Sequence, residues 1–211
     1  VEVTRARPGV DVGRTLRAAS AQLRHGEHPA AIESIRSVLA QRPDHPDALH
    51  LLGLWQHERG DSPAAVASIR AAIAAWPPDD PVLAGAWNNL GNVLLESGHG
   101  SDAVEAYRAS LAIDPANAPT WGNLATLLRR LGRPDEAVIA ARAGVDHDPT
   151  DPQGWFTLAR ALIETDDVAG GLRAHAHAVA LGPVDSVGRD QVVRSLVLLG
   201  RLDDAAELYR V

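Results

Sequence analysis

The sequence contains no cysteine, no methionine and no lysine, because all 20 basic residues are arginine. The lack of cysteine excludes disulfides, thiolate nucleophiles and cysteine-ligated zinc. The lack of lysine excludes a Schiff-base lysine and a phosphate-loop lysine. Aromatic residues make up only 4% of the chain, whereas alanine, leucine and arginine dominate. This composition favours helices over strands.

The chain also lacks an excess of basic charge, since its formal net charge is −7. A nucleic-acid-binding protein needs a basic face that displaces counterions, so we expect no nucleic-acid partner. No apolar run is long enough to cross a bilayer, and residues 1–13 lack the apolar segment of a signal peptide. We therefore expect a cytoplasmic protein with no membrane partner. The arginine- and alanine-rich usage suggests a bacterial source.

Small residues recur along the chain with a period of 34 residues and one irregular step of 38 between the second and third units. One row is Gly26, Gly60, Gly98, Gly132, Asp166 and Gly200. A second row is Ala31, Ala65, Ala103, Ala137, Gly171 and Ala205. A third row is Pro43, Pro77, Pro115, Pro149 and Pro183. Because all three rows share the irregular step, the pattern indicates a structural repeat with one insertion.

Each unit has the spacing of two helices. The first helix ends near the glycine, which supplies a left-handed turn, and the second stops before the proline. In the third unit we expect a second helix over 101–113, capped by Ser101 or Asp102. We expect the row Trp87, Trp121 and Trp155 to pack in the core. A lone pair cannot bury its apolar face, so stacked pairs should form a solenoid.

Two segments carry a resemblance to a known family: AWNNLGNVLLESGHGSDAVEAYRASLAIDP and TWGNLATLLRRLGRPDEAVIAARAGVDHDP. They resemble tetratricopeptide repeats in the order and spacing of tryptophan, glycine, alanine and proline. The resemblance implies an all-α, right-handed α-solenoid of about six antiparallel helix pairs. We place an N-terminal extension at 1–11 and a repeat domain at 12–211, with repeats at 12–45, 46–79, 84–117, 118–151, 152–185 and 186–211.

Three local features depart from the regular repeat. The insertion at 78–81 ends in Asp80 and Pro81, an N-cap and first-turn pair, so we expect the next helix to begin about one turn early. Gly170 and Gly171 weaken a helix interior, so we expect the second helix of the fifth repeat to be the least stable. The chain stops midway through its last expected helix, so we expect the natural protein to continue beyond residue 211.

The resemblance implies that first helices line a concave groove where a ligand lies. By their positions in the repeat, we assign these residues to a peptide-binding groove: His50, His57, Asn88, Asn89, Asn92, Asn123, Thr126, Arg130, Phe156, Arg160 and Arg194.

Asparagine is the most informative member of this set. It is a poor helix former, so its recurrence on first helices needs a reason. A side-chain amide both donates and accepts hydrogen bonds, which suits the backbone of an extended peptide. Asn92 and Asn123 match the peptide-gripping positions of the family. The alternative is that these amides bridge neighbouring helices or face water, and the sequence leaves both open.

The charges of the groove bear on its ligand. The family's clamp for a terminal carboxylate needs basic residues at positions that Asn88, Gln153 and Thr157 occupy here, which argues against such a clamp. Glutamates and aspartates at other groove positions balance the arginines, so we expect no strongly charged ligand. These acidic residues are Glu58, Glu96, Glu164 and Asp190.

No pattern of residues points to catalysis. His50 and His57 are seven residues apart, too far for shared metal ligation without a ligand between them. Neither a nucleophile–histidine–acid set, a phosphate loop nor a zinc-protease motif occurs. We therefore predict no catalytic residue, no metal site and no cofactor in these 211 residues.

Three functions fit this organisation. The first is a scaffold that binds a peptide or protein segment in the groove. The second is the substrate-recruiting part of a larger bacterial enzyme, namely a glycosyltransferase resembling the O-linked N-acetylglucosamine transferases, a sulfotransferase or a hydroxylase. The third is a self-assembling scaffold, hence a homo-oligomer.

Overall fold

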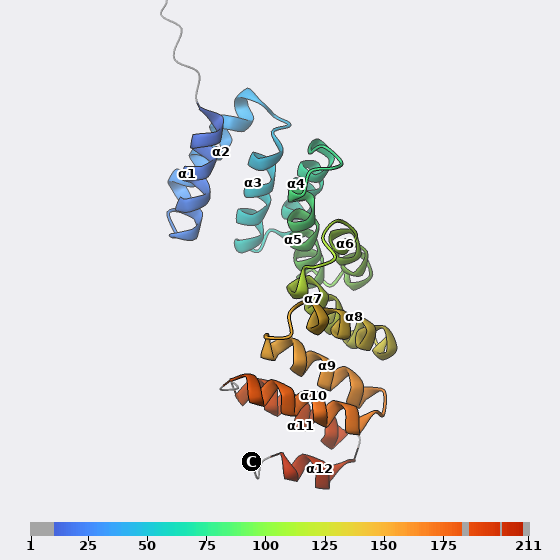
Figure 1. The fold of residues 1–211 in the computed structure, drawn as a ribbon. Coiled ribbons are helices and arrows are strands. Elements are labelled where there is room, and N and C mark those ends of the chain that lie inside the picture. The colour runs from blue at the N-terminus through green and yellow to red at the C-terminus, as the bar shows by residue number, and fades with distance from the viewer. Residues whose placement is uncertain (1–10, 183–185, 199, 209–211) are drawn as a thin grey trace, which may run out of the picture. The chain divides into compact units, whose positions relative to one another are not determined.

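A computed structural model describes residues 11–182, 186–198 and 200–208, without the side chains of 186–189, 191 and 195. Every element in the described residues is an α-helix, as predicted (Figure 1). The chain divides into two compact units, residues 1–97 and 98–211. The expected extension at 1–11 lies outside the described residues apart from Asp11.

The first unit contains α1 (Val12–Arg24), α2 (His28–Gln41), α3 (Pro46–Glu58), α4 (Ser62–Ala75) and α5 (Val82–Glu96). The second unit contains α6 (Gly100–Ile113), α7 (Ala118–Arg130), α8 (Pro134–His147), α9 (Pro152–Glu164), α10 (Val168–Leu181), α11 (Ser186–Leu198) and α12 (Leu202–Glu207). Helices that follow each other across short turns pack in antiparallel pairs, among them α3 with α4, α7 with α8 and α9 with α10. The all-α architecture of paired helices is confirmed.

The glycine row forms the turns within these pairs. Gly26, Gly60, Gly98, Gly132 and Gly200 have φ angles between 71° and 80°, in the left-handed region. Asp166 stands in the same row and takes φ 67°, although it carries a side chain. Left-handed backbone is strained for a residue with a Cβ, so the turn before α10 is held in place by its surroundings.

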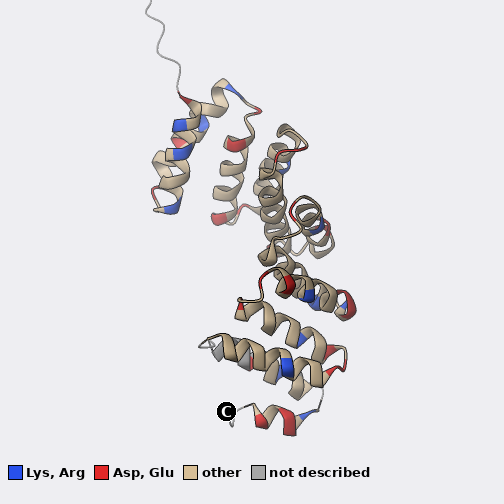
Figure 2. Ribbon diagram, in the orientation of Figure 1, with Lys and Arg blue, Asp and Glu red and all other residues tan. Residues whose placement is uncertain are grey.

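Aspartate and asparagine side chains start several helices. Asp61 accepts a hydrogen bond from Ala64 N–H at 3.2 Å, and Asn117 accepts one from Thr120 N–H at 3.0 Å. Many acidic residues lie in the turns for this reason (Figure 2). The expected cap of α6 is wrong, because that helix begins at Gly100, and its N-cap residue, His99, makes no side-chain cap.

The insertion lengthens α5 at its start. This helix has 15 residues, against 13 for α3 and α7. The carboxylate of Asp80 accepts from Val82 N–H at 3.0 Å, and its carbonyl accepts from Leu83 N–H at 3.1 Å. The helix therefore begins early, but by two residues compared with α3 and α7 and not by the full turn that the insertion predicts.

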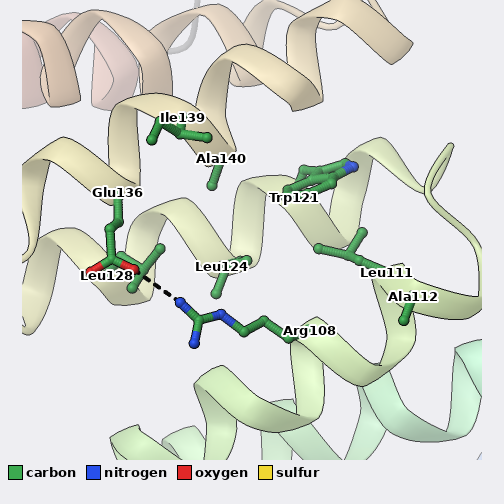
Figure 3. Close-up of a pocket in the computed structure, with 9 residues that line it drawn as sticks. All are labelled: Arg108, Leu111, Ala112, Trp121, Leu124, Leu128, Glu136, Ile139 and Ala140. Carbon is green, nitrogen blue, oxygen red and sulfur yellow. Dashed lines mark hydrogen bonds and ion pairs between the residues drawn. The ribbon is translucent and has the colours of Figure 1, made fainter.

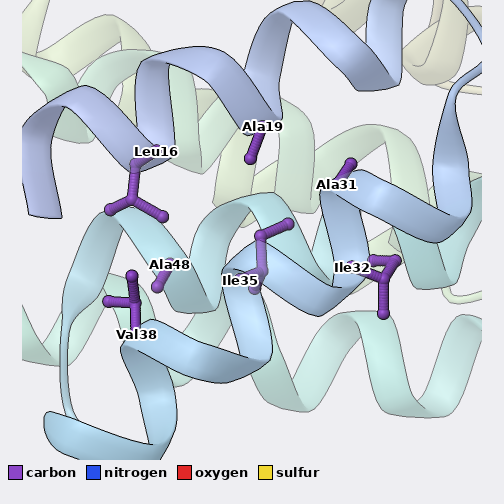
Figure 4. Close-up of a cluster of buried hydrophobic side chains, with 7 residues drawn as sticks. All are labelled: Leu16, Ala19, Ala31, Ile32, Ile35, Val38 and Ala48. Carbon is purple, nitrogen blue, oxygen red and sulfur yellow. The ribbon is translucent and has the colours of Figure 1, made fainter. Parts of the chain in front are cut away.

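The core of the first unit forms where small residues let helices approach. Leu16 and Ala19 of α1 meet Ile35 and Val38 of α2 in a buried cluster completed by Ala31, Ile32 and Ala48 (Figure 4). Gly53 of α3 also allows close helix packing, since an added Cβ would lie 2.6 Å from Ile69 Cγ1 of α4. These contacts require glycine or alanine and explain the rows of small residues.

The tryptophan row differs from the expected core role. Trp121 and Trp155 are half-buried, and their indole N–H groups donate to the carbonyls of Pro115 at 2.8 Å and Pro149 at 2.9 Å. The indole N–H thus pairs with a turn carbonyl while the rest of the ring stays partly exposed, so these two tryptophans lie at the edge of the core. Trp76 is the most buried tryptophan of the described residues, at 7% exposure.

Candidate binding groove

A cleft of about 350 Å³ lies on the second unit and is lined by residues of α7, of α8 and of the start of α9. We call it the α7–α9 cleft. Its lining residues are Ala118, Pro119, Gly122, Asn123, Thr126, Ala141, Gly144, Asp151, Gln153, Gly154 and Thr157. Two of the residues assigned to the groove from the sequence, Asn123 and Thr126, thus lie together in its lining.

Glycine and alanine make up part of the lining of the α7–α9 cleft. An added Cβ on Gly122 would meet no atom within 4 Å, so this position opens onto free space. Gly144 of α8 lies against Trp121, whose Cβ would be 3.3 Å from an added methyl group. At Gly122, the missing side chain leaves open space in the cleft.

The sides of the α7–α9 cleft are polar. Asn123 and Gln153 contribute amides, and Thr126 and Thr157 contribute hydroxyls. The hydroxyl of Thr157 donates to the carbonyl of Gln153 at 2.9 Å, which leaves its oxygen able to accept. Asp151 accepts from the N–H groups of Gln153 and Gly154, both at 3.0 Å, and so holds the first turn of α9. The cleft therefore presents both donors and acceptors on an ordered frame.

A cluster of arginines follows the cleft at the C-terminal ends of α7 and α9. Arg129 Nη1 donates to Glu164 Oε1 at 2.6 Å, and both side chains are largely buried. Burial is the main cause that lowers the pKa of Arg160 to about 10. The positive charge of Arg129 acts in the same direction, as does that of Arg194, whereas Glu164 opposes them. Arg130 and Arg194 are exposed.

Phe156 is not part of the groove surface. Its side chain is 2% exposed, and its ring packs edge-on against His175 of α10 with centroids 5.4 Å apart. The sequence analysis expected Phe156 on the ligand side, because it takes the fifth position of its repeat. The reason for the difference is that α10 carries His175 at a core position, and the phenylalanine ring fills the space against it.

The first unit brings His50 and Asn89 together. Asn89 Nδ2 and His50 Nε2 are 3.1 Å apart, so this amide bridges α5 and α3. The His50 ring lies edge-on to Trp76 at 5.4 Å, and Trp76 Nε1 donates to Asp47 at 3.3 Å. Burial lowers the pKa of His50, and the nearby Asp47 offsets part of that effect. For Asn89, the bridging interpretation holds in this structure.

His57 and the remaining asparagines lie on the same helices. His57 Nε2 is 3.4 Å from Glu96 Oε2, a second link between α3 and α5. Asn88 and Asn92 are half-buried residues of α5. Asn123 belongs to the second unit, so the predicted pair of Asn92 and Asn123 is divided between the two units.

A second cleft, of about 320 Å³, lies across α6, α7 and α8 and was not predicted from the sequence (Figure 3). Its walls are apolar, from Leu111, Trp121 and Leu124 to Ile139, which is 68% exposed. Arg108 at its edge pairs with Glu136 at 2.9 Å. A hydrogen bond from Arg133 is the main cause that lowers the pKa of Glu136. The sequence gives no clear signal for this surface, because the exposure of Ile139 is known only from the structure.

Two further properties concern the described part of the chain. No group of three or more histidine, aspartate or glutamate side chains there has the arrangement to hold a metal ion. Within the same residues, no helix combines the length and apolar character needed to cross a membrane.

Comparison with known proteins agrees with this architecture. Family models described as tetratricopeptide repeat match residues 16–80, 58–118 and 94–155. No curated protein matches the chain in sequence.

Several solved structures have the same fold at low sequence identity. PilF of Pseudomonas aeruginosa has a TM-score of 0.74 and 16% identity, covering 93% of this chain and 88% of that one. The C-terminal part of a tetratricopeptide-repeat protein from Cytophaga hutchinsonii has a TM-score of 0.76 and 16% identity, covering 92% and 76%. YrrB, a repeat protein with an unusual peptide-binding site, has a TM-score of 0.67 and 15% identity, covering 84% and 89%. The chain belongs to the tetratricopeptide-repeat family.

Proposed function

We propose that this chain is a non-catalytic scaffold that binds an extended peptide segment of a partner protein in the α7–α9 cleft. Tetratricopeptide repeats generally mediate protein–protein interactions. The observation that carries the proposal is the cleft itself, whose lining combines polar side chains of two first helices with glycine and alanine residues.

The chemistry of the cleft suits a peptide backbone. An extended backbone presents N–H and C=O groups along its length, and amide side chains such as Asn123 and Gln153 can pair with both. Glycine at position 122 leaves room for a side chain of the peptide beside those polar groups. YrrB, with its peptide-binding site, supports a peptide as the ligand class.

A blocking substitution tests the proposal. Gly122→Leu places a branched side chain in the cleft at a position where an added Cβ meets nothing, so the helix should fold normally. Peptides selected from a display library on the 211-residue protein should lose at least about tenfold in affinity for this variant. Asn123→Ala should weaken the same peptides in the same direction.

The matched control is Ala176→Leu, which adds the same side chain to an exposed position of α10 in the same unit. This control should leave peptide affinity unchanged. Library peptides that bind Gly122→Leu as tightly as the parent protein would show that the cleft is not the binding site. Circular dichroism of the variants establishes that the helices are intact.

A further inference from the structure

A third cleft, of about 360 Å³, lies in the first unit and is lined by residues of α2 and of the end of α3. We call it the α2–α3 cleft. Its volume is at the lower end of the range of about 300–1,000 Å³ that small-molecule sites have. None of its lining residues belongs to the groove predicted from the sequence: His28, Pro29, Ile32, Glu33, Arg36, Trp55 and Arg59.

Trp55 departs from the regular repeat at this cleft. Its register in the next three repeats is taken by Val93, Leu127 and Ala161, each 1% exposed. Trp55 is only half-buried, and its buried Nε1–H has no acceptor among the described residues. An unpaired buried donor costs free energy, and an aliphatic residue would fill the position without that cost. Packing alone therefore does not explain a tryptophan here, whereas a role in a binding site would.

The guanidinium group of Arg59 lies over the Trp55 ring. Arg59 Cζ is 5.3 Å from the ring centroid, a cation–π contact. This contact restricts the arginine side chain before any ligand arrives, so less conformational entropy is lost on binding. Arg59 forms no ion pair with any residue that the structure describes, which leaves its guanidinium N–H groups able to bind an anion.

Arg36 is the second arginine of the cleft, and a comparison with the third repeat shows what it lacks. Arg108, at the same register, pairs with Glu136 at 2.9 Å. Ala64 takes the register of Glu136 beside the first repeat, so the equivalent carboxylate is missing. Within the described part of the chain, Arg36 forms no ion pair. Both arginines that line the cleft thus keep their hydrogen-bonding capacity for a ligand.

The lining also includes one carboxylate and an apolar wall. Glu33 carries that carboxylate and opposes an anion. A second carboxylate, that of Glu58, lies beside an imidazole, with Oε2 at 3.8 Å from His28 Nδ1. Pro29 and Ile32 supply apolar surface together with the indole. The cleft therefore offers two guanidinium groups against one lining carboxylate, next to a wall that suits a ring.

We propose that the α2–α3 cleft binds a small organic anion, namely an aromatic carboxylate or an aromatic phosphate monoester. Its oxygens accept hydrogen bonds from Arg36 and Arg59. Its ring packs against Ile32 and the indole of Trp55. Hydrogen bonds from guanidinium groups to such oxygens are strong because both partners are charged, and aromatic rings pack well on indole and guanidinium surfaces. The site lies in the first unit, so it does not rest on the function proposed for the α7–α9 cleft.

Three small probes test the proposal with the 211-residue protein. They are phenyl phosphate, 3-phenylpropionate and the neutral 3-phenylpropanamide. Calorimetry gives the affinities. The indole N–H signals in nitrogen-15 NMR spectra report on the site, because the chain has only five tryptophans and Trp55→Phe identifies the signal of Trp55.

We expect at least one of the two anions to bind at least about tenfold tighter than the amide and to shift the Trp55 signal. A preference for phenyl phosphate identifies a phosphate monoester as the ligand class, and a preference for 3-phenylpropionate identifies a carboxylate. Equal affinity of all three probes, no binding of either anion, or binding that leaves the Trp55 signal in place would overturn the proposal.

Variants separate a site effect from bulk charge. Arg36→Gln and Arg59→Gln should each remove most of the preference for anions, and Arg36→Lys should retain part of it. The matched control is Arg70→Gln, at an exposed position with the register of Arg36 in the next second helix and outside the cleft lining. This control makes the same change in net charge and should leave the preference intact. Equal losses in Arg36→Gln and Arg70→Gln would contradict the proposal.

Two further variants locate the binding. Trp55→Leu introduces the residue type of position 127, so it should keep the helices, as circular dichroism would show, and weaken both anions. Gly122→Leu, in the second unit, should leave the anion preference unchanged. Loss of the preference in Gly122→Leu would place the probes in the α7–α9 cleft and refute the anion site. Library peptides that bind Gly122→Leu normally count against the proposed function and leave the anion site standing.

Discussion

Asn89 Nδ2 lies 3.1 Å from His50 Nε2, so a side-chain amide and an imidazole join α5 to α3. In the neutral imidazole, Nε2 can accept the amide hydrogen, whereas the protonated ring offers only donors. Burial lowers the pKa of His50 more than Asp47 raises it, which favours this neutral form. The contact therefore depends on pH.

We predict that His50 makes the first unit less stable in mild acid. Because its folded pKa is below its unfolded value of about 6.5, the unfolded chain binds the proton more readily. This contribution to stability is fully present above the unfolded pKa and is lost as the pH falls from there toward the folded pKa. Urea unfolding at pH 7.5 and pH 5.5 measures it. His50→Gln, which keeps an acceptor for Asn89, should show a smaller loss on acidification; an equal loss would contradict the prediction.

We predict that the backbone of Asp166 is strained in the folded protein. Asp166 is a non-glycine residue with φ 67° in a row otherwise made of glycines. Asp166→Gly should raise the free energy of unfolding by about 1 kcal/mol, because glycine adopts the left-handed conformation without a Cβ clash. Asp167→Ala should do the opposite by about 1 kcal/mol, since Asp167 caps α10 through Gly170 N–H at 2.8 Å. Thermal unfolding of both variants checks the two signs.

Replacing glycine by alanine inside a helix usually stabilises a protein, but we expect the opposite at Gly171. An added Cβ would lie 2.9 Å from the Ala159 carbonyl oxygen of α9, closer than real contacts allow. Gly171→Ala should therefore lower stability by about 1–3 kcal/mol. Gly122→Ala has open space around the new methyl group and should raise stability by up to about 1 kcal/mol. Equal shifts of the unfolding midpoint in the two variants would show that helix packing does not set the choice of glycine.

Glu164 and Arg129 form a partly buried ion pair between α9 and α7. Glu164→Gln removes the carboxylate that Arg129 holds at 2.6 Å. The same change should destabilise the protein by about 1–3 kcal/mol, because a partly buried guanidinium loses its charged partner. Glu105→Gln, in an exposed pair with Arg108, should change stability by less than about 1 kcal/mol. Urea unfolding of the two variants measures both effects, and equal losses of stability would contradict the prediction.

Helical periodicity predicts the face of a helix on which a site residue lies, but not whether that residue is exposed. Asn123 and Thr126 lie three residues apart and share one face of α7, in the lining of the α7–α9 cleft. Phe156 is also assigned to the groove by its repeat position, but it is buried. Its ring packs against His175 of the neighbouring helix α10. Periodicity cannot distinguish these cases, since the deciding residue lies on another helix.

Two functional alternatives from the sequence stay predictions. One is a catalytic domain in the same protein, and the other is association with further copies of this chain. Analysis of the complete gene checks the first, and light scattering over a range of concentrations checks the second.

By itself, the sequence determined the helical repeat and its turns. Gly60 and Gly132 close helices, and Asp61 and Asn117 start them, through interactions with residues a few positions away. Such local chemistry acts wherever the segment is placed. Only the tertiary structure decided which charges meet. Arg129 and Glu164 are 35 residues apart, and their pairing depends on how closely α7 and α9 pack. Close packing of side chains from different helices brings the two residues together, and no pattern local to either helix specifies that contact.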